Sequence, residues 1–251
     1  MFDFLASFNL SGENLFWVMF CAVCIGMAKT GLSGAGMLIV PIMASVFGSK
    51  ESTGIVLPML IMADVFGVSY YHRHAEIGYL LKLAPATVLG VVTGIWVGDI
   101  VDGNQFTFIL AAVVLFGVAI TIWQEVTKSK LIVHNLFFAS VAGFLGGFTT
   151  MIGNAAGPVM SIYFLSMGLP KNSFIGTSAW FFFLVNVFKV PFHITVWDTI
   201  TWETFKLDLV MFPLIVLGAL IGIKVVKLIP EKPFRIFILV SIILASLKLF
   251  F

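Results

Sequence analysis

The stretch Pro85-Ala-Thr-Val-Leu-Gly-Val-Val-Thr-Gly-Ile95 occurs a second time, in altered form, as Pro213-Leu-Ile-Val-Leu-Gly-Ala-Leu-Ile-Gly-Ile223. The Pro, one Val, the Leu, both Gly and the final Ile coincide at identical spacing. Apolar segments of this kind, where they extend to about 20 residues, are typical of helices that cross a membrane. The two copies therefore predict a membrane protein with an internal repeat.

The repeat extends beyond this segment. Asp64-Val-Phe66 corresponds to Asn186-Val-Phe188, and Ser33-Gly-Ala-Gly36 corresponds to Asn154-Ala-Ala-Gly157. Gly and Leu are common in apolar helices, so a chance coincidence is the alternative interpretation. Because the matches keep their order along the chain, we interpret residues 1–126 as a first transmembrane repeat and residues 127–251 as a second.

The composition also favours a membrane protein. Of 251 residues, 60% are hydrophobic and 10% are charged, whereas a soluble domain usually has about 25% charged residues. Membrane lipid is therefore an expected partner. The net charge of +2 and the lack of a basic run in the sequence argue against a nucleic-acid partner.

Apolar runs divide each half into five segments. Most runs reach the length of a membrane span, about 17–25 residues, but some neighbouring runs are short and are separated only by uncharged, Gly-rich breaks. Such breaks are either tight turns at the membrane surface or unwound backbone that lines a cavity inside the protein. We expect an all-α membrane protein with about 8–10 transmembrane helices, some of them short or broken. The runs are residues 15–30, 34–48, 53–72, 80–99, 106–123, 131–150, 152–168, 174–192, 206–229 and 234–250.

The charges between the runs predict the orientation. If every run changes sides, basic residues such as Arg73, Lys82 and Lys171 fall on one face, and acidic residues such as Asp99 and Asp102 fall on the other. Short cytoplasmic loops collect Lys and Arg, so both termini are predicted to lie outside the plasma (inner) membrane. Five runs per half is an odd number, and the second half must therefore enter the membrane in the opposite direction. Such an inverted repeat is common among secondary transporters.

The two glycine-rich breaks have the features of an anion site. Gly lets the backbone approach a ligand closely, and a broken helix presents free N–H groups and the positive end of its dipole to an anion. In an inverted repeat the two breaks meet near the midplane, where transporters bind substrate. Close helix packing is the alternative role for the glycines. The predicted substrate-binding residues are Lys29, Thr30, Ser33, Gly34, Gly36, Thr150, Asn154, Gly157, Pro158 and Asn186.

Charged residues near the breaks are candidates for binding and coupling. An ammonium group at the bilayer centre costs about 2.5–3.5 kcal/mol on insertion scales, which favours a functional role for Lys29; an anchor at the inner surface is the alternative. Asp64 and Asn186 occupy matching positions in the middle of their spans. Asp64 is the predicted coupling residue, which accepts a proton, and a structural ion pair with Lys29 is the alternative. Lys189 and His193 lie near the outer end of their span, where we expect them to reach the interface by snorkelling; attraction of an anion is the alternative.

The segment Gly31-Leu-Ser-Gly-Ala-Gly-Met-Leu-Ile-Val-Pro41 resembles the glycine-rich segment, followed by apolar residues and Pro, of the sulfite exporter TauE/SafE family. Gly153-Asn-Ala-Ala-Gly-Pro158, with Gly168-Leu-Pro170 after it, resembles the second copy of that segment. The family's segments are richer in consecutive Gly, and the replacements at Ala35, Asn154 and Ala155 indicate a subgroup with a different substrate. The resemblance implies transport of a small sulfur-containing anion such as sulfite, thiosulfate, sulfoacetate or another organosulfonate.

We therefore predict a secondary transporter that moves such an anion across the plasma membrane by alternating access, and not an enzyme. The sequence contains no Gly-x-x-x-x-Gly-Lys-Ser/Thr motif, so ATP is not a direct energy source through this chain, and no cofactor or metal is expected. Two alternatives come from other classes. The first is a membrane thiol-redox carrier that uses Cys21 and Cys24, although small buried residues are the better interpretation of that pair; the second is a lipid-embedded scaffold. A homo-oligomer is compatible with the sequence.

Overall fold

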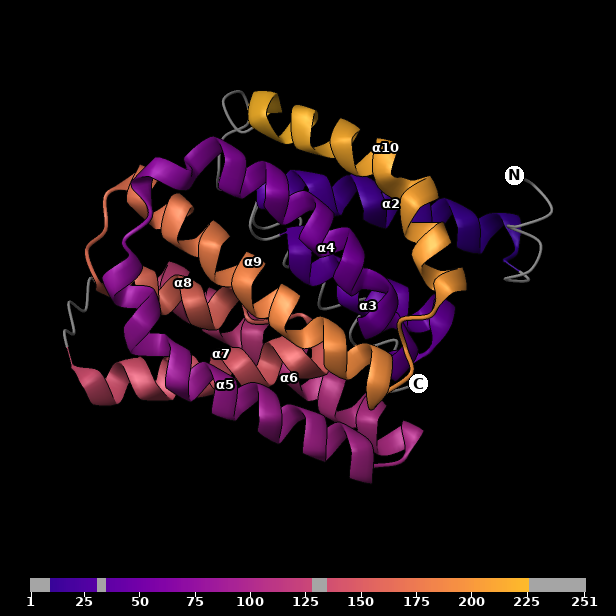
Figure 1. The fold of residues 1–251 in the computed structure, drawn as a ribbon, viewed down its shortest axis with the longest axis horizontal. Helices are drawn as coiled ribbons and strands as arrows, with labels where there is room; N and C mark the ends of the chain where they lie inside the picture. The colour runs from indigo at the N-terminus through magenta and orange to yellow at the C-terminus, as the bar shows by residue number, and fades with distance from the viewer. Residues whose placement is uncertain (1–9, 31–34, 128–134, 226–251) are drawn as a thin grey trace.

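The computed structural model describes residues 10–30, 35–127 and 135–225, and in these ranges the chain is entirely helical, without a β-strand (Figure 1). The described ranges form nine α-helices and one short 3-10 helix, η1. The elements are α2 (Gly12–Lys29), α3 (Ala35–Phe47), α4 (Ser49–Tyr71), η1 (His72–His74), α5 (Ile77–Ile100), α6 (Gly103–Thr127), α7 (Leu136–Gly153), α8 (Gly157–Ser166), α9 (Lys171–Thr195) and α10 (Trp202–Val225).

Seven of the described helices are long and apolar enough to cross a membrane by length and composition. The two others, α3 with 13 residues and α8 with 10, are too short to cross alone, since a span needs about 20 residues. The predicted all-α membrane class with short or broken helices is thereby confirmed. Nine of the predicted runs correspond to these helices, and the tenth, residues 234–250, lies outside the described residues.

Each short helix follows a break in the chain. After α7, Asn154 adopts the left-handed conformation (φ 53°, ψ 26°), and its backbone N–H donates to the carbonyls of Thr149 and Thr150. Asn tolerates this conformation better than most residues because its short polar side chain can bond locally. Gly157 and Pro158 then start α8, and Pro suits the first turn because the N–H it lacks has no partner there. The break between α2 and α3 contains residues 31–34, which lie outside the described residues.

Glycines bring two pairs of helices into close contact, α5 with α7 and α2 with α10. A Cβ atom on any of four glycines would overlap a backbone carbonyl oxygen of the facing helix. The contacts of the first pair and those of the second pair involve positions that the sequence comparison aligns with each other. The contacts are Gly90 on Phe144 and Gly147 on Thr87 in the first pair, and Gly218 on Val23 and Gly26 on Ile215 in the second.

These pairs cross between the two halves of the sequence. α5, from the first half, packs on α7 of the second, and α10, from the second half, packs on α2 of the first. One apolar cluster joins α2, α3, α4 and α10, and another joins α5, α7, α8 and α9. In Figure 1, α4 and α9 run through the middle, with α2 and α10 on one side and α5 and α7 on the other. α4 and α9 also pack against each other, and the site described next lies where they meet.

Candidate functional site

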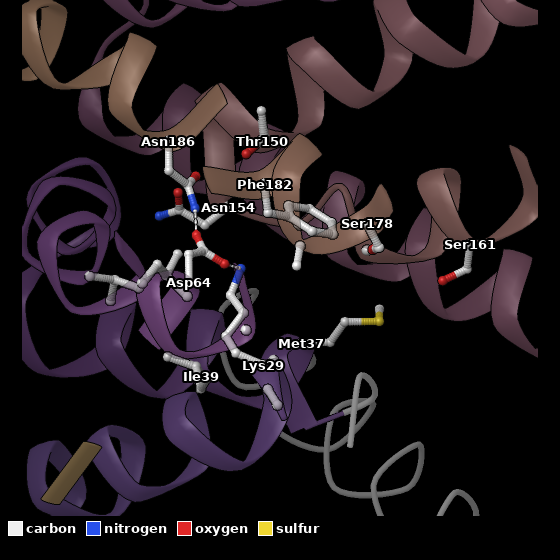
Figure 2. A pocket seen from close by; sticks show the side chains of 18 of the residues that line it. Lys29, Met37, Ile39, Asp64, Thr150, Asn154, Ser161, Ser178, Phe182 and Asn186 are labelled. Atoms are coloured by element: carbon white, nitrogen blue, oxygen red, sulfur yellow. Dashed lines mark hydrogen bonds and ion pairs between the residues drawn. The ribbon is translucent and has the colours of Figure 1, made fainter. Parts of the chain in front are cut away.

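A cavity of about 160 Å³ lies between the two central helices, α4 and α9, and the break after α7 (Figure 2). It is bounded by the C-terminal end of α2, the N-terminal ends of α3 and α8, the break after α7, and the facing sides of α4 and α9. Its walls are mostly apolar, with a small set of polar side chains. The polar lining consists of Lys29, Asp64, Thr150, Asn154, Ser161, Ser178 and Asn186.

An ion pair joins α2 to α4 at this cavity. The Lys29 ammonium lies 2.7 Å from Asp64 Oδ1, and the lysine side chain is 15% exposed while the aspartate is 1% exposed. Asn186 Nδ2 donates to the other carboxylate oxygen at 2.7 Å. Asp64 and Asn186, which the sequence comparison matched, are therefore in direct contact. The ion pair with Lys29, given as the alternative role of Asp64, is present.

Lys29 is the charged group that a ligand in the cavity would meet first. Its ammonium lies 4.4 Å from the centre of the Phe182 ring, within the range of a cation–π contact. Figure 2 shows the ammonium turned toward Asp64, with Phe182 and Ser178 on the opposite wall. An ammonium has three donors, so Lys29 can contact an incoming anion before its contact with the carboxylate is broken.

A second lysine, Lys189 of α9, is completely buried behind the cavity. Its ammonium donates to the Thr150 carbonyl at 2.8 Å, to Thr150 Oγ1 at 3.0 Å and to Asn154 Oδ1 at 2.6 Å. Asn154 Nδ2 in turn donates to the Thr53 carbonyl of α4 at 3.0 Å. Asn154 thus connects the break after α7 with α9 on one side and with α4 on the other.

The expectation that Lys189 and His193 snorkel to the interface is wrong, since both side chains are fully buried. Snorkelling requires a face turned to lipid, and these residues lie on the inner face of α9. Asn186, Lys189 and His193 follow one another at helical spacing, so all three share a face. That periodicity, anchored on Asn186, is the sequence signal that could have placed Lys189 in the site.

Two of the glycines that line the cavity, Gly36 and Gly157, are not close-packed. A Cβ atom on Gly157 would meet no atom within 4 Å, and one on Gly36 would make only an ordinary contact at 3.8 Å with Ala28. Close helix packing therefore does not account for these two glycines, whose backbone borders open space. Ser33 and Gly34, also predicted as binding residues, lie outside the described residues.

Two predicted binding residues do not line the cavity. The Thr30 hydroxyl donates to carbonyls of its own helix, Gly26 at 3.1 Å and Met27 at 3.3 Å, and Gly222 of α10 faces it closely. Pro158 is buried against Gly117 of α6. The structure brings together Lys29, Gly36, Asp64, Thr150, Asn154, Gly157 and Asn186 of the predicted set.

The cavity contains hydrogen-bond donors that can contact an anion, beside the Asp64 carboxylate. It offers an ammonium group, two amides and several hydroxyls, with the N-terminal ends of α3 and α8 at its border. Among the described residues no group of three or more His, Cys, Asp or Glu side chains could hold a metal ion. Cys21 and Cys24 are free thiols buried in the apolar cluster of α2, α3, α4 and α10, away from the cavity lining.

Comparison with known proteins gives one match. The model of a protein family described as sulfite exporter TauE/SafE matches residues 18–249. No curated protein and no solved structure matches the chain.

Proposed function

The chain belongs to the sulfite exporter TauE/SafE family, and from this we propose that it carries a small sulfur-containing oxyanion such as sulfite through the cavity around Lys29. The family membership that the sequence predicts is thereby confirmed. Membership makes it a membrane transporter of sulfur anions. The particular anion, the binding residues and the mechanism are the parts that we propose.

The observation that carries the proposal is the partly exposed Lys29 ammonium of the Lys29–Asp64 pair in a mostly apolar cavity. A lone ammonium would attract anions without selection, whereas one already paired with a carboxylate holds an anion only if further donors are within reach. Thr150, Asn154, Ser161 and Ser178 line the same cavity and supply such donors. Gly36 and Gly157 leave room for the ligand beside the ends of α3 and α8.

The negative charge left on Asp64 when an anion binds Lys29 supports a coupling role for Asp64. When an anion takes over the Lys29 ammonium, Asp64 is left 1% exposed with the Asn186 amide as its remaining close donor. A buried carboxylate without a cation is strongly destabilised, so the exchange favours a proton on Asp64. Anion and proton therefore move together. An external pH below the internal pH should stimulate uptake by the wild type, and should have no such effect on Asp64→Asn.

Alternating access would use the repeat. The equivalent glycine contacts of α5 with α7 and of α10 with α2 support two related halves, residues 1–126 and 127–251, and the odd number of runs per half supports their inversion across the plasma membrane, with both termini outside. The central contact of Asp64 with Asn186 would then lie on the pseudo-symmetry axis. Relative movement of the two apolar clusters about this contact would expose the cavity to one side and then the other.

The thiol-redox alternative has little support. Cys21 and Cys24 are buried in an apolar cluster and do not line the cavity. A reactive thiol is usually partly accessible and stabilised by a nearby positive charge, and this cluster consists of apolar residues.

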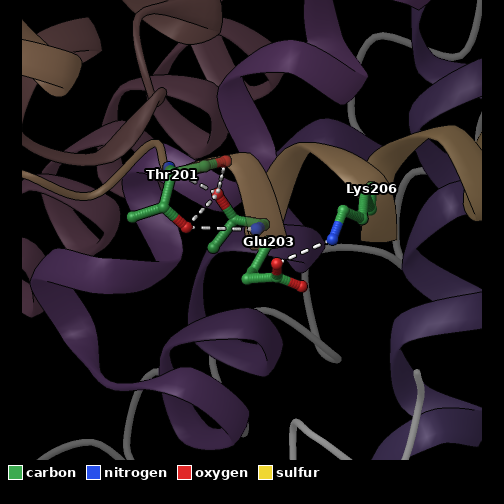
Figure 3. Close-up of polar contacts among 4 residues, drawn as sticks. Thr201, Glu203 and Lys206 are labelled. Atoms are coloured by element: carbon green, nitrogen blue, oxygen red, sulfur yellow. Dashed lines mark hydrogen bonds and ion pairs between the residues drawn. The ribbon is translucent and has the colours of Figure 1, made fainter. Parts of the chain in front are cut away.

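The test is sulfite uptake into proteoliposomes by Lys29→Met and by a matched control. Lys206→Met removes the same charge from an exposed pair with Glu203 at the start of α10, where the two groups lie 2.7 Å apart (Figure 3). Exposed pairs contribute only about 0–1 kcal/mol, so this variant should transport like the wild type. Lys29→Met should lose saturable uptake while remaining folded in detergent. Wild-type uptake by a folded Lys29→Met variant would refute the assignment.

A further inference from the structure

One face of α9 changes character at Asn186. On the side toward Lys171, Ser178 and Phe182 line the cavity and are partly exposed. On the side toward Thr195, the same face continues through Lys189 and His193, which are fully buried. The cavity thus reaches as far as Asn186 and ends there, although the polar face of the helix continues.

This buried part of the face carries more polar groups than are needed to close the helix bundle. Lys189 is held by neutral oxygens of Thr150 and Asn154, and it forms no ion pair with a carboxylate among the described residues. His193 uses Nδ1 to contact Thr199 Oγ1 at 2.8 Å, while its Nε2 has no hydrogen-bond partner in the described ranges. Apolar residues would close the bundle without these desolvation penalties.

Further side chains extend this buried face toward the N-terminal end of α4 and the C-terminal end of α9. The His193 ring packs edge-on against Trp197, with ring centres 5.0 Å apart. The ammonium of Lys50, at the start of α4, lies 5.2 Å from the centre of the Trp197 ring. Lys29, Lys189 and Lys50 therefore form a series of cations that begins in the open cavity and ends beside this tryptophan. Ionisable groups inside a membrane bundle commonly mark the route of an ion or substrate.

We propose that the face of α9 from Asn186 to His193 lines the second half of the anion path, closed in this conformation, and that Lys189 binds the anion when this half opens. The Lys189 ammonium then exchanges oxygens of Thr150 and Asn154 for oxygens of the anion. Its release also frees Asn154, which holds the break after α7 against Thr53 of α4. The inference rests on the proposed transport function and adds a second cation site, used from the opposite side of the membrane to Lys29.

The test compares KM for sulfite from the two sides of the membrane, in intact cells and in inside-out vesicles, for Lys189→Met and Lys189→Arg. Loss of a charge-assisted contact corresponds to about a tenfold to hundredfold change. Lys189→Met should raise KM by this factor on the side of the membrane to which the closed half of the path opens. The change on the other side should be much smaller. Lys189→Arg should retain most of the affinity. A merely structural role as a partner of the Thr150 carbonyl would weaken transport equally from both sides.

A second variant covers the case in which Lys189→Met does not reach the membrane. His193→Asn keeps a donor or acceptor for Thr199 and removes the ring nitrogen that has no partner, and it should show a smaller KM increase on the same side. Equal KM changes on both sides, or no change on either side, would overturn this inference. Saturable sulfite transport by the wild type would still support the proposed function. If the wild type shows no saturable sulfite transport in either preparation, the proposed function itself fails.

Discussion

Removing Lys29 should destabilise the protein more than removing its partner Asp64. Lys29→Met leaves a carboxylate that is 1% exposed, with one amide donor from Asn186 at 2.7 Å. Removal of one partner of a buried pair costs about 3–5 kcal/mol. Because each kcal/mol shifts the unfolding temperature of a chain of this size by about 2–4 °C, the expected drop is roughly 6–20 °C.

Asp64→Asn should have a smaller effect. The remaining ammonium is 15% exposed to the cavity and keeps its contact with the Phe182 ring, so it is partly solvated. We expect a loss of about 1–3 kcal/mol, the range for a group left without its hydrogen-bond partner. The double variant Lys29→Met/Asp64→Asn carries no unpaired charge at this place and should be more stable than Lys29→Met alone.

The measurement is thermal unfolding of the four proteins in one detergent, analysed as a double-mutant cycle. The loss of thermal stability in Lys29→Met should also become smaller as the pH is lowered, because acid protonates the unpaired Asp64 carboxylate. The variant Asp64→Asn has no such carboxylate and should not show this pH dependence. A double variant no more stable than Lys29→Met would show that the two groups are not energetically coupled. The account of Asp64 as the coupling residue would then be lost as well.

Three further predictions address the packing, the break and the cysteines. Gly147→Ala should destabilise by at least about 1–3 kcal/mol through overpacking, measured by thermal unfolding, while Gly78→Ala, whose Cβ would meet no atom within 4 Å, should be neutral or slightly stabilising. Asn154→Gly should unfold at a higher temperature than Asn154→Ala, because Ala is strained by about 1–2 kcal/mol in the left-handed conformation, yet both should bind sulfite weakly in a thermal-shift titration. The variant Cys21→Ala/Cys24→Ala should retain sulfite uptake, and loss of uptake in the folded variant would favour the thiol-redox alternative.

The helices could be predicted from sequence because membrane spans depend on length and apolarity, which a single chain displays directly. The breaks were predictable for a related reason: Gly153 and Asn154 interrupt an apolar run without a charge, and the structure ends α7 there. Asp64 and Asn186 were predicted as matching positions. Their direct contact could not be derived, because it depends on how α4 and α9 pack in three dimensions.

The errors concern the direction of side chains. Depth along α9 suggested that Lys189 reaches the interface, but burial depends on which face of a helix meets protein, and residue count does not give that face. Thr30 lies next to Lys29 in sequence, yet its hydroxyl turns back to carbonyls of its own helix. Sequence therefore located the region of the cavity, whereas the choice between neighbouring residues required the packing.

The exchange of helices between the halves has a consequence for biosynthesis. α2 is the first described helix to leave the ribosome, and its glycine contact surface is covered by α10, the last described helix. During synthesis, Gly26 therefore lacks its facing helix until α10 has been made. Pairing of segments so distant in sequence is slow, and quality-control proteases have the whole of translation in which to act. A chain truncated after Thr127 should accordingly be degraded in cells, and should persist when residues 128–251 are supplied as a separate polypeptide.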